Sequence, residues 1–313
     1  MRHVVLDCDP GHDDAIAILM LLADPEIQVD GISVVAGNQT LDKTVRNALQ
    51  VLTVAGRADV PVYAGMPGPM ARELVTAAHV HGQSGLDGPD LPPPSAQPAP
   101  THAVEWLSGH LAASTEPIDV VATGPLSNLG MVLRQDPALA GKIRRLVVMG
   151  GAVGEGNITP SAEFNIYVDP EAARTVFDAG APLTMIGLDV THRAMLYRPD
   201  IERLRAIGGS VATMAADLLA FVSRFHLRRY GVDGTAVHDA CAVAALRRPD
   251  LLSTRRLRVD VETRGAVTDG RTVVDLWGVT ERAPNVDVGL DIDRDAFVAM
   301  LEDDVARLSA GIG

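Results

Sequence analysis

The 313-residue chain has few of the features that mark secreted, membrane or nucleic-acid-binding proteins. Its two cysteines, Cys8 and Cys241, are too few for a disulfide framework, which favours a reducing cytoplasm. The apolar run at 15–23 is far shorter than the roughly 20 residues that cross a bilayer. The formal net charge of −13 argues against nucleic acid, because proteins that bind the phosphate backbone need basic patches. The sequence therefore predicts a cytoplasmic protein whose partner is neither a membrane nor a nucleic acid.

Other familiar signals are missing as well. We expect no signal peptide, because a strand that leads into an acidic turn begins directly after Met1. The sequence contains no visible internal repeat, coiled coil or P-loop, and the glycines at 151, 154 and 156 do not have the spacing of a dinucleotide-binding loop. Hydrophobic residues make up 47% of the chain and charged residues 21%, which indicates a globular protein with a substantial core.

The most informative stretch is the acidic turn at residues 7–14, Asp-Cys-Asp-Pro-Gly-His-Asp-Asp, which has four carboxylates in eight residues. An apolar strand precedes its Pro-Gly pair and an apolar helix follows. Side chains alternate along a strand, so Asp7 and Asp9 should share one face at the strand end. Asp13 and Asp14 should lie on the first turn of the helix. We therefore expect all four carboxylates to converge on one small volume.

Carboxylates this close together raise one another's pKa unless a positive charge is held among them. A divalent cation is the simplest remedy, and hard oxygen ligands without a Cys/His cluster favour Ca²⁺ or Mg²⁺ over zinc. In the competing interpretation, Asp13 and Asp14 only stabilise the helix N-terminus, and Asp7 and Asp9 are solvated turn residues. A helix start needs one or two carboxylates rather than four, so we favour the cation site. Strand alternation turns Cys8 away from these acids, and we interpret it as a buried structural residue.

The rest of the chain alternates strands and helices. Four apolar stretches have the character of buried strands: 29–36, 118–123, 146–151 and 183–188. Helical patterns separate them, which indicates βαβ units and a mainly parallel central sheet flanked by helices. Three later strands joined by short turns are expected as antiparallel additions near the C-terminus: 257–262, 272–277 and 286–290. We predict a single α/β domain over residues 1–313, with a proline-rich loop at about 82–100 that is either a functional lid or disordered.

Ligands of parallel sheets bind beyond the carboxyl ends of the strands. Asn38 and Thr123 follow strands at that edge, as Asp9 does, although Asn38 could be an ordinary turn residue and Thr123 an ordinary strand terminus. Thr123 could supply an oxygen ligand through its carbonyl or hydroxyl. His79 and His81 are spaced like zinc ligands on a strand, but no further Cys or His accompanies them. We interpret His81 as a polar residue facing a pocket, with a plain loop histidine as the alternative.

Two later stretches bring further polar residues. Glu163 and Asn165 should alternate onto one side of their segment, and a carboxylate beside an amide is a good partner for hydroxyl groups. His238 and Asp239 open an apolar helix, where an Asp alone would be an ordinary cap. A further acid beside a histidine weakens that ordinary interpretation. One aromatic stripe at helical spacing is typical of a core or an interface rather than a ligand site: Phe221, Phe225 and Tyr230.

Taken together, these motifs resemble those of the inosine-uridine preferring nucleoside hydrolase family. The resemblance is carried by the stretches at 7–15, 35–38, 123–128, 149–151, 163–166 and 238–239. It extends from about Val4 to the final helix, and the D-x-D-P-G-x-D-D turn is highly specific. It implies an α/β enzyme that uses Ca²⁺ to hydrolyse the N-glycosidic bond of ribonucleosides to free base and ribose, and that forms a homodimer or homotetramer.

The resemblance also implies roles for individual residues. The cation ligands would be Asp9, Asp14, Asp239 and the carbonyl of Thr123. Asp9 would be the general base for a metal-bound water, and His238 at the pocket rim could be the acid that protonates the leaving base. The residues that bind the substrate would be Asp13, Asn38, His81, Met149, Glu163, Asn165 and Asp239. Among them, His81 would contact the base and Met149 would lie against the sugar. Family members that favour purines tend to stack the base on tryptophans, and the two tryptophans here are Trp106 and Trp277. His81 and His238 resemble the histidines of the branch that hydrolyses uridine and cytidine, often with inosine too.

Two other functions fit parts of the sequence. One is a haloacid-dehalogenase-type phosphatase with Asp7 as nucleophile and Asp9 as acid/base, although the residues after Asp9 would then be apolar or Thr. The other is a calcium- or nucleoside-binding protein without turnover. An EF-hand is excluded, because the twelfth position counted from Asp7 is Ile18 rather than Glu. Phosphate release without ribose release would support the phosphatase, and a bound but intact nucleoside would support the binding protein.

Overall fold

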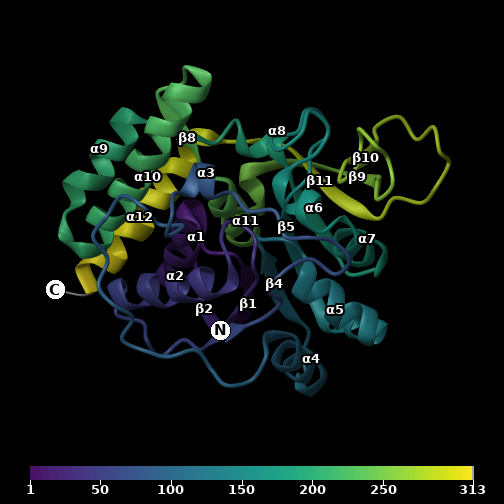
Figure 1. Ribbon diagram of the computed structural model, residues 1–313, viewed down its shortest axis with the longest axis horizontal. Coiled ribbons are helices and arrows are strands. Elements are labelled where there is room, and N and C mark those ends of the chain that lie inside the picture. Colours follow the sequence, from purple (N-terminus) through teal and green to yellow (C-terminus); the bar gives the residue numbers. More distant parts are fainter. Residues whose placement is uncertain (312–313) are drawn as a thin grey trace.

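The computed structural model describes residues 1–311, apart from the side chain of Tyr230, the last residue of the predicted aromatic stripe. Its main feature is a central sheet of nine strands (Figure 1). These strands are β1 (Arg2–Cys8), β2 (Ile27–Val34), β3 (Val62–Ala64), β4 (Ile118–Ala122), β5 (Ile143–Met149), β6 (Leu183–Ile186), β9 (Leu252–Val261), β10 (Thr272–Asp275) and β11 (Val286–Ile292). A separate small antiparallel sheet pairs β7 (Met195–Tyr197) with β8 (Gly234–Ala236).

The order of strands across the central sheet is β10-β9-β11-β6-β5-β4-β1-β2-β3. From β11 to β3 in that order, every neighbouring pair is parallel. Strand β9 pairs antiparallel with both β11 and β10. The predicted α/β fold, with a mainly parallel sheet and antiparallel additions near the C-terminus, is therefore confirmed.

Helices cover both faces of the sheet (Figure 1). They are α1 (His12–Ala23), α2 (Leu41–Val54), α3 (Ala78–His81), α4 (Ala103–Ala113), α5 (Ser127–Gln135), α6 (Phe164–Val168), α7 (Pro170–Asp178), α8 (Leu188–Thr191), α9 (Arg198–Ile207), α10 (Gly209–Tyr230), α11 (His238–Arg247) and α12 (Arg294–Gly311). Within residues 1–311, none of them is both long and apolar enough to cross a membrane.

Each face of the sheet has its own hydrophobic core, because side chains alternate along the strands. On β1, Val4 and Leu6 belong to the core formed with α1, α2, α10, α11 and α12. Val5, between them, belongs to the core formed with α4, α5 and α7. Cys8 and Cys241 are both buried in the first core, as predicted for Cys8. With both faces covered, the exposed edge at the carboxyl ends of the parallel strands is where a ligand can approach.

One local prediction was wrong. Glu163 and Asn165 were expected to alternate as in a strand, but Glu163 is the N-cap of α6 and Asn165 lies in its first turn. The Glu163 carboxylate accepts the backbone N–H groups of Asn165 at 2.9 Å and Ile166 at 3.1 Å. Such capping bonds stabilise a helix start that the alternation of polar and apolar residues did not indicate.

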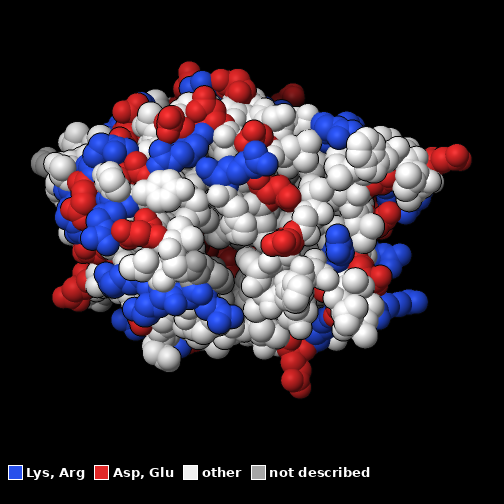
Figure 2. All heavy atoms as spheres, turned by 90° about the horizontal axis from the view of Figure 1, so that it is seen from above, with Lys and Arg blue, Asp and Glu red and all other residues white. Residues whose placement is uncertain are grey.

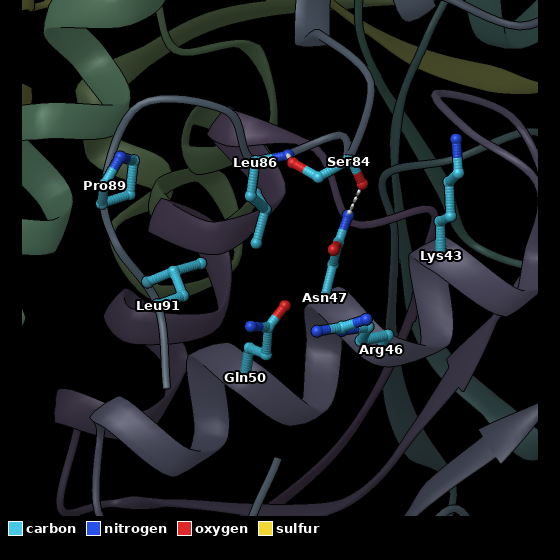
Figure 3. A pocket seen from close by; sticks show the side chains of 8 residues that line it. All are labelled: Lys43, Arg46, Asn47, Gln50, Ser84, Leu86, Pro89 and Leu91. Atoms are coloured by element: carbon cyan, nitrogen blue, oxygen red, sulfur yellow. Dashed lines mark hydrogen bonds between the residues drawn. The ribbon is translucent and has the colours of Figure 1, made fainter. Parts of the chain in front are cut away.

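The proline-rich loop lies against α2 (Figure 3). The amide nitrogen of Asn47 donates to the carbonyl of Pro10 at 2.9 Å and to that of Ser84 at 3.0 Å. The side-chain amide nitrogen of Gln50 donates to the carbonyl of Pro92 at 2.9 Å. A cavity of about 300 Å³ remains between the loop and the helix. One side chain on α2 therefore ties the acidic turn to the loop.

Candidate functional site

A larger cavity, of about 610 Å³, opens at the carboxyl edge of the sheet. Figure 2 shows a hollow in this face with acidic atoms at its floor. The volume is in the range of small-molecule sites. The predicted site residues that line the cavity are Asn38, Thr123, Met149, Glu163, Asn165, His238 and Asp239. Segments far apart in the chain are thus brought to one place, because the strands that precede Asn38, Thr123 and the acidic turn all end at this edge.

Three carboxylates form the tightest group of acids at this edge. Oxygens of Asp13, Asp14 and Asp239 all lie within 4.8 Å of one another. Asp14 is held by the backbone N–H of Gly11 at 2.9 Å and by the hydroxyl of Thr123 at 2.8 Å. The acids come from the starts of α1 and α11, so two helix N-termini face the same volume.

Asp9 lies next to this group, although it is not one of the three. The backbone N–H of Asn38 donates to its Oδ2 at 2.6 Å, and the Asn38 side chain donates to its carbonyl at 3.1 Å and to Asp14 at 3.2 Å. Gly37 gives Asp9 its room, because a Cβ at residue 37 would lie 2.1 Å from Oδ2 of Asp9. Asn38 therefore orients two of the acids at once.

Burial strongly disfavours the ionised forms of these acids. It raises the pKa of Asp13 to about 7, with the charge of Asp14 adding to the effect. Burial is also the main reason why the pKa of Asp9 and that of Asp239 lie well above the usual carboxyl range. The pKa of Glu163 rises to about 7 through burial, although the backbone N–H groups that it accepts oppose the shift. A cluster of this kind needs either bound protons or a bound cation.

The donor set fits a divalent cation. Oδ1 of Asp9 is buried and has no hydrogen-bond partner among the described residues, which is costly for a carboxylate oxygen unless it coordinates something positive. The neighbouring donors are the oxygens of Asp13, Asp14, Asp239 and Thr123, all hard ligands of the type that Ca²⁺ and Mg²⁺ prefer. The carbonyl of Thr123, predicted as a ligand, accepts the side-chain amide of Asn165 at 2.7 Å.

Asp7 does not join the other acids, so the expectation that all four carboxylates of the turn converge was wrong. Asp7 is still inside β1, where it pairs with Ser33, and its side chain turns towards α5. It accepts the Ser33 hydroxyl at 2.5 Å and the Asn128 amide at 2.8 Å, and it is fully buried. A nucleophile must reach its substrate, so this placement argues against the phosphatase alternative.

The predicted histidines differ in their placement. His238 lines the cavity, with Nδ1 2.7 Å from the Thr191 hydroxyl, and burial lowers its pKa to about 3. His81 was interpreted as facing a pocket, but it is buried against His12 and is not part of the cavity wall. His79 occupies the wall instead, at the other end of the single turn α3.

Several residues of the cavity wall were missed from the sequence. Phe225 was assigned to a core or interface, yet it lines the cavity and lies edge-on to His79 with ring centroids 6.3 Å apart. The other missed wall residues include Asn157, Ile158, His192, Tyr197 and His226. The glycine-rich stretch before Asn157 was the one local signal of a binding loop. Trp106 stacks on Tyr63 and Trp277 is 87% exposed, so neither tryptophan contributes to the wall.

Comparisons with known proteins agree with this architecture. Residues 4–299 match the family described as inosine-uridine preferring nucleoside hydrolase. The chain is 51% identical over 301 residues to the pyrimidine-specific ribonucleoside hydrolase RihA of Escherichia coli O9:H4 (strain HS), covering 96% of this chain and 97% of that protein. Among solved structures, a purine-preferring ribonucleoside hydrolase from Gardnerella vaginalis has a TM-score of 0.93 at 29% identity, covering 98% of this chain and 99% of that one. The plant nucleoside hydrolase PpNRh1 has a TM-score of 0.91 at 32% identity, covering 99% of each chain.

Proposed function

Because the chain belongs to the inosine-uridine preferring nucleoside hydrolase family and is a nucleoside hydrolase, we propose that it cleaves the N-glycosidic bond of pyrimidine ribonucleosides in a Ca²⁺-dependent reaction. The observation that carries this proposal is the set of buried carboxylates at the cavity floor, one of which has an oxygen without a partner. Uridine and cytidine are the proposed substrates, inosine a weaker one, and free base and ribose the products.

The proposed cation ligands are Asp9, Asp14, Asp239 and the carbonyl of Thr123. A Ca²⁺ ion held by these oxygens would supply positive charge that keeps the carboxylates ionised and would make a nearby water more acidic. The partnerless oxygen of Asp9 and the raised pKa values of Asp14 and Asp239 support this assignment. The tight group also contains Asp13, which we assign to the substrate because it is the least buried of the three.

Asp9 is the proposed general base. Burial and the charge of Asp14 raise its pKa, and a bound cation would keep the carboxylate ionised and therefore able to take a proton. Its Oδ2 is fixed by the N–H of Asn38, whereas Oδ1 accepts no hydrogen bond within the described chain and can take a proton from the attacking water. The same oxygen would therefore both coordinate the cation and accept the proton of the water beside it, and no hydrogen bond within residues 1–311 has to break.

The remaining polar side chains would hold the sugar. Glu163 and Asn165 share the start of α6, and the Asn165 amide also reaches the carbonyl and sulfur of Met149, at 3.1 and 3.5 Å. Glycosidic bonds break through an oxocarbenium-like state, so carboxylates around the ribose stabilise the positive charge that develops. The hydroxyl partners in this proposal are Asp13, Asn38, Glu163, Asn165 and Asp239, with Met149 against the ring.

His238 is the proposed acid for the leaving base. Its pKa of about 3 makes the ring neutral when no anion is beside it. The negative charge that develops on a departing pyrimidine would raise this pKa and draw a proton onto the ring. The Thr191 hydroxyl fixes the ring through Nδ1, which leaves Nε2 for the base.

The pyrimidine preference has two supports. The chain shares 51% identity with a relative named as pyrimidine-specific, compared with 29% for the structural neighbour named as purine-preferring. The cavity wall also lacks Trp106 and Trp277, large flat side chains on which a purine could stack. We assign His81 to base recognition from a position behind the wall.

A panel of nucleosides tests the proposal. Purified protein with Ca²⁺ should release reducing sugar from uridine and cytidine faster than from inosine, adenosine or guanosine, and 2′-deoxyuridine should be poor. The Asp9→Ala variant, purified in parallel, controls for contaminating hydrolases. Faster release from purines would overturn the specificity, and no ribose release from any nucleoside would overturn the reaction.

We also propose that the chain assembles as a homodimer or homotetramer. Large apolar side chains near the edge strand β10 support a protein contact there, since Val267, Trp277 and Val279 are 82%, 87% and 80% exposed. Sedimentation at micromolar concentration should give the mass of two or four chains, and a monomer would contradict the proposal.

A further inference from the structure

Thr191 holds one nitrogen of the His238 ring, and the direction of this hydrogen bond has a consequence for the cavity. Thr191 is the last residue of α8, and it is completely buried. Its hydroxyl lies 2.7 Å from Nδ1 of His238 and has no second hydrogen-bond partner within residues 1–311. Because His238 lines the cavity, this bond decides which group of its ring is offered to a ligand.

The Thr191 hydroxyl is the donor in this bond. Two other threonines in helices, Thr53 and Thr175, donate their hydroxyl hydrogens to the carbonyl four residues earlier, at 2.7 and 2.9 Å. In the part of the chain that the structure describes, the only acceptor for the Thr191 hydrogen is Nδ1 of His238. A hydrogen on Nδ1 would leave that of the hydroxyl buried without an acceptor, which is unfavourable.

The direction of the bond fixes the hydrogen of the ring. A ring nitrogen that accepts a hydrogen bond has a lone pair and no hydrogen, so the single hydrogen of a neutral imidazole lies on Nε2. An imidazolium has a hydrogen on both nitrogens, so Nε2 carries one in either protonation state. No backbone N–H or other side chain among residues 1–311 is hydrogen-bonded to either nitrogen of His238. Nε2 is therefore a donor whose partner must come from the cavity.

Packing helps to keep the ring in this orientation. The ring of His192 lies edge-on to that of His238, with centroids 5.7 Å apart and planes at 63°. His192 follows Thr191 directly in the chain and also lines the cavity. The same short segment thus supplies the hydroxyl for Nδ1 and a ring against the imidazole. A rotation that exchanged the two nitrogens would break the bond to Thr191.

We propose that Thr191 is a positioning residue that keeps the hydrogen of His238 on Nε2 and so presents a hydrogen-bond donor to the base. Resting on the proposed function, the inference is that this N–H is donated to the C2 carbonyl oxygen of the pyrimidine. Uracil and cytosine share this acceptor, whereas their groups at positions 3 and 4 differ. The same oxygen takes part of the negative charge left on the base, so the bond strengthens as the glycosidic bond breaks.

The tautomer can be measured without any substrate. In protein labelled with ¹⁵N-histidine, His238 is identified by the loss of its signals in His238→Phe. We expect a pyridine-type shift for Nδ1 and a pyrrole-type shift for Nε2. Thr191→Val keeps the branched shape but has no hydroxyl, so the hydrogen should distribute over both nitrogens and the two shifts should move towards each other. Thr191→Ser keeps the hydroxyl and should retain the wild-type shifts.

A matched control is Thr175→Val. Thr175 is also a helical threonine whose hydroxyl makes one hydrogen bond, to the carbonyl of Glu171, and it does not line the cavity. This variant should leave the His238 signals unchanged. A wild-type Nδ1 that carries a hydrogen would overturn the proposal, and so would His238 signals that are the same in Thr191→Val as in the wild type.

A kinetic test asks whether Thr191 acts through His238. Thr191→Val should lower kcat/KM for uridine by about 2- to 10-fold, the range for one hydrogen bond, and Thr191→Ser should recover most of it. In a His238→Phe background the same change should have no further effect. Equal losses in both backgrounds would make Thr191 a merely structural residue. If the wild type hydrolyses no nucleoside, the proposed function fails, and the ¹⁵N experiment still decides the tautomer.

A comparison of two substrates tests the contact with the base. The loss in Thr191→Val should be similar for uridine and cytidine, because both bases have the C2 carbonyl. A loss confined to one of the two would place the contact at position 3 or 4 of the ring and would overturn the assignment to the C2 oxygen.

Discussion

Replacing Asp14 with Asn removes one negative charge from the acid cluster and keeps the shape of the side chain. The Oδ2 position accepts the N–H of Gly11 at 2.9 Å and the amide of Asn38 at 3.2 Å, and the Oδ1 position faces the Thr123 hydroxyl at 2.8 Å. An Asn with its oxygen at the Oδ2 position and its amino group at the Oδ1 position keeps these contacts, because the Thr123 hydroxyl can rotate to accept a hydrogen bond. We therefore expect Asp14→Asn to fold.

The magnitude follows from the spacing of the acids. With oxygens of Asp13, Asp14 and Asp239 within 4.8 Å, each fully charged pair repels by about 3.5 kcal/mol or more at an effective dielectric constant of about 20. Sharing of protons relieves part of this repulsion in cation-free protein. We expect Asp14→Asn to raise the free energy of unfolding by about 2 to 4 kcal/mol at pH 8 in chelator.

The pH dependence has a definite sign. Burial raises the pKa of Asp14 in the folded protein, so the folded state binds this proton more tightly than the unfolded state does. Above the ordinary carboxyl pKa of about 4, the cation-free wild type therefore loses stability as the pH rises. The advantage of Asp14→Asn should be small at pH 4 and should grow towards pH 8.

Urea unfolding followed by circular dichroism, with and without Ca²⁺, measures both effects. Saturating Ca²⁺ should stabilise the wild type, by about 2.7 kcal/mol at 100 times its Kd, and should do little for Asp14→Asn, which should also release no ribose. A variant that is less stable than the wild type in chelator at pH 8 would refute the reasoning, as would equal stabilisation of both proteins by Ca²⁺.

Four further predictions concern the same site. Chelator-treated protein should lose ribose release and regain it with Ca²⁺, and unchanged rates would remove the cation from the mechanism. Asp9→Ala should abolish ribose release from uridine without unfolding the protein, and normal turnover would contradict its role as base. Gly37→Ala places a Cβ 2.1 Å from Oδ2 of Asp9. It should reduce kcat at least about 100-fold, as expected when a catalytic group is displaced by about 1 Å. A normal rate would mean that Asp9 can move freely. Asn47→Leu leaves the carbonyls of Pro10 and Ser84 without their donor and should cost about 2 to 4 kcal/mol in urea unfolding, whereas an unchanged midpoint would show that water replaces the amide.

The sequence was sufficient for the parts of the protein that depend on local periodicity. The strands predicted at 118–123 and 183–188 correspond to β4 (Ile118–Ala122) and β6 (Leu183–Ile186), because apolar runs decide such elements. Asn38 and Thr123 were placed at the site by one rule about the carboxyl ends of parallel strands, and both line the cavity.

Placements that depend on tertiary contacts could not be predicted. Asp7 was grouped with the other acids because alternation gives only the face of a strand, not the point at which the chain leaves the sheet. Ser33 and Asn128, which hold Asp7, come from two other elements. His81 likewise packs against His12, which comes from a distant part of the chain, and a single sequence does not reveal this contact.

Shared hydrogen bonds join the acidic turn, which carries the acid cluster, to the proline-rich loop. Buried acids with raised pKa values destabilise the folded chain in the absence of a cation, so the surrounding structure must hold the acidic turn in place. Asn47 holds the turn by donating a hydrogen bond to the carbonyl of Pro10, and His12 holds it through the contact of Nε2 with the carbonyl of Asp87. Since both side chains also bind the loop, any movement that opens the loop must loosen the turn. Cation affinity and loop closure should therefore be coupled, and hydrogen exchange of residues 82–88 should slow when Ca²⁺ binds; equal exchange with and without Ca²⁺ would show that the two are independent.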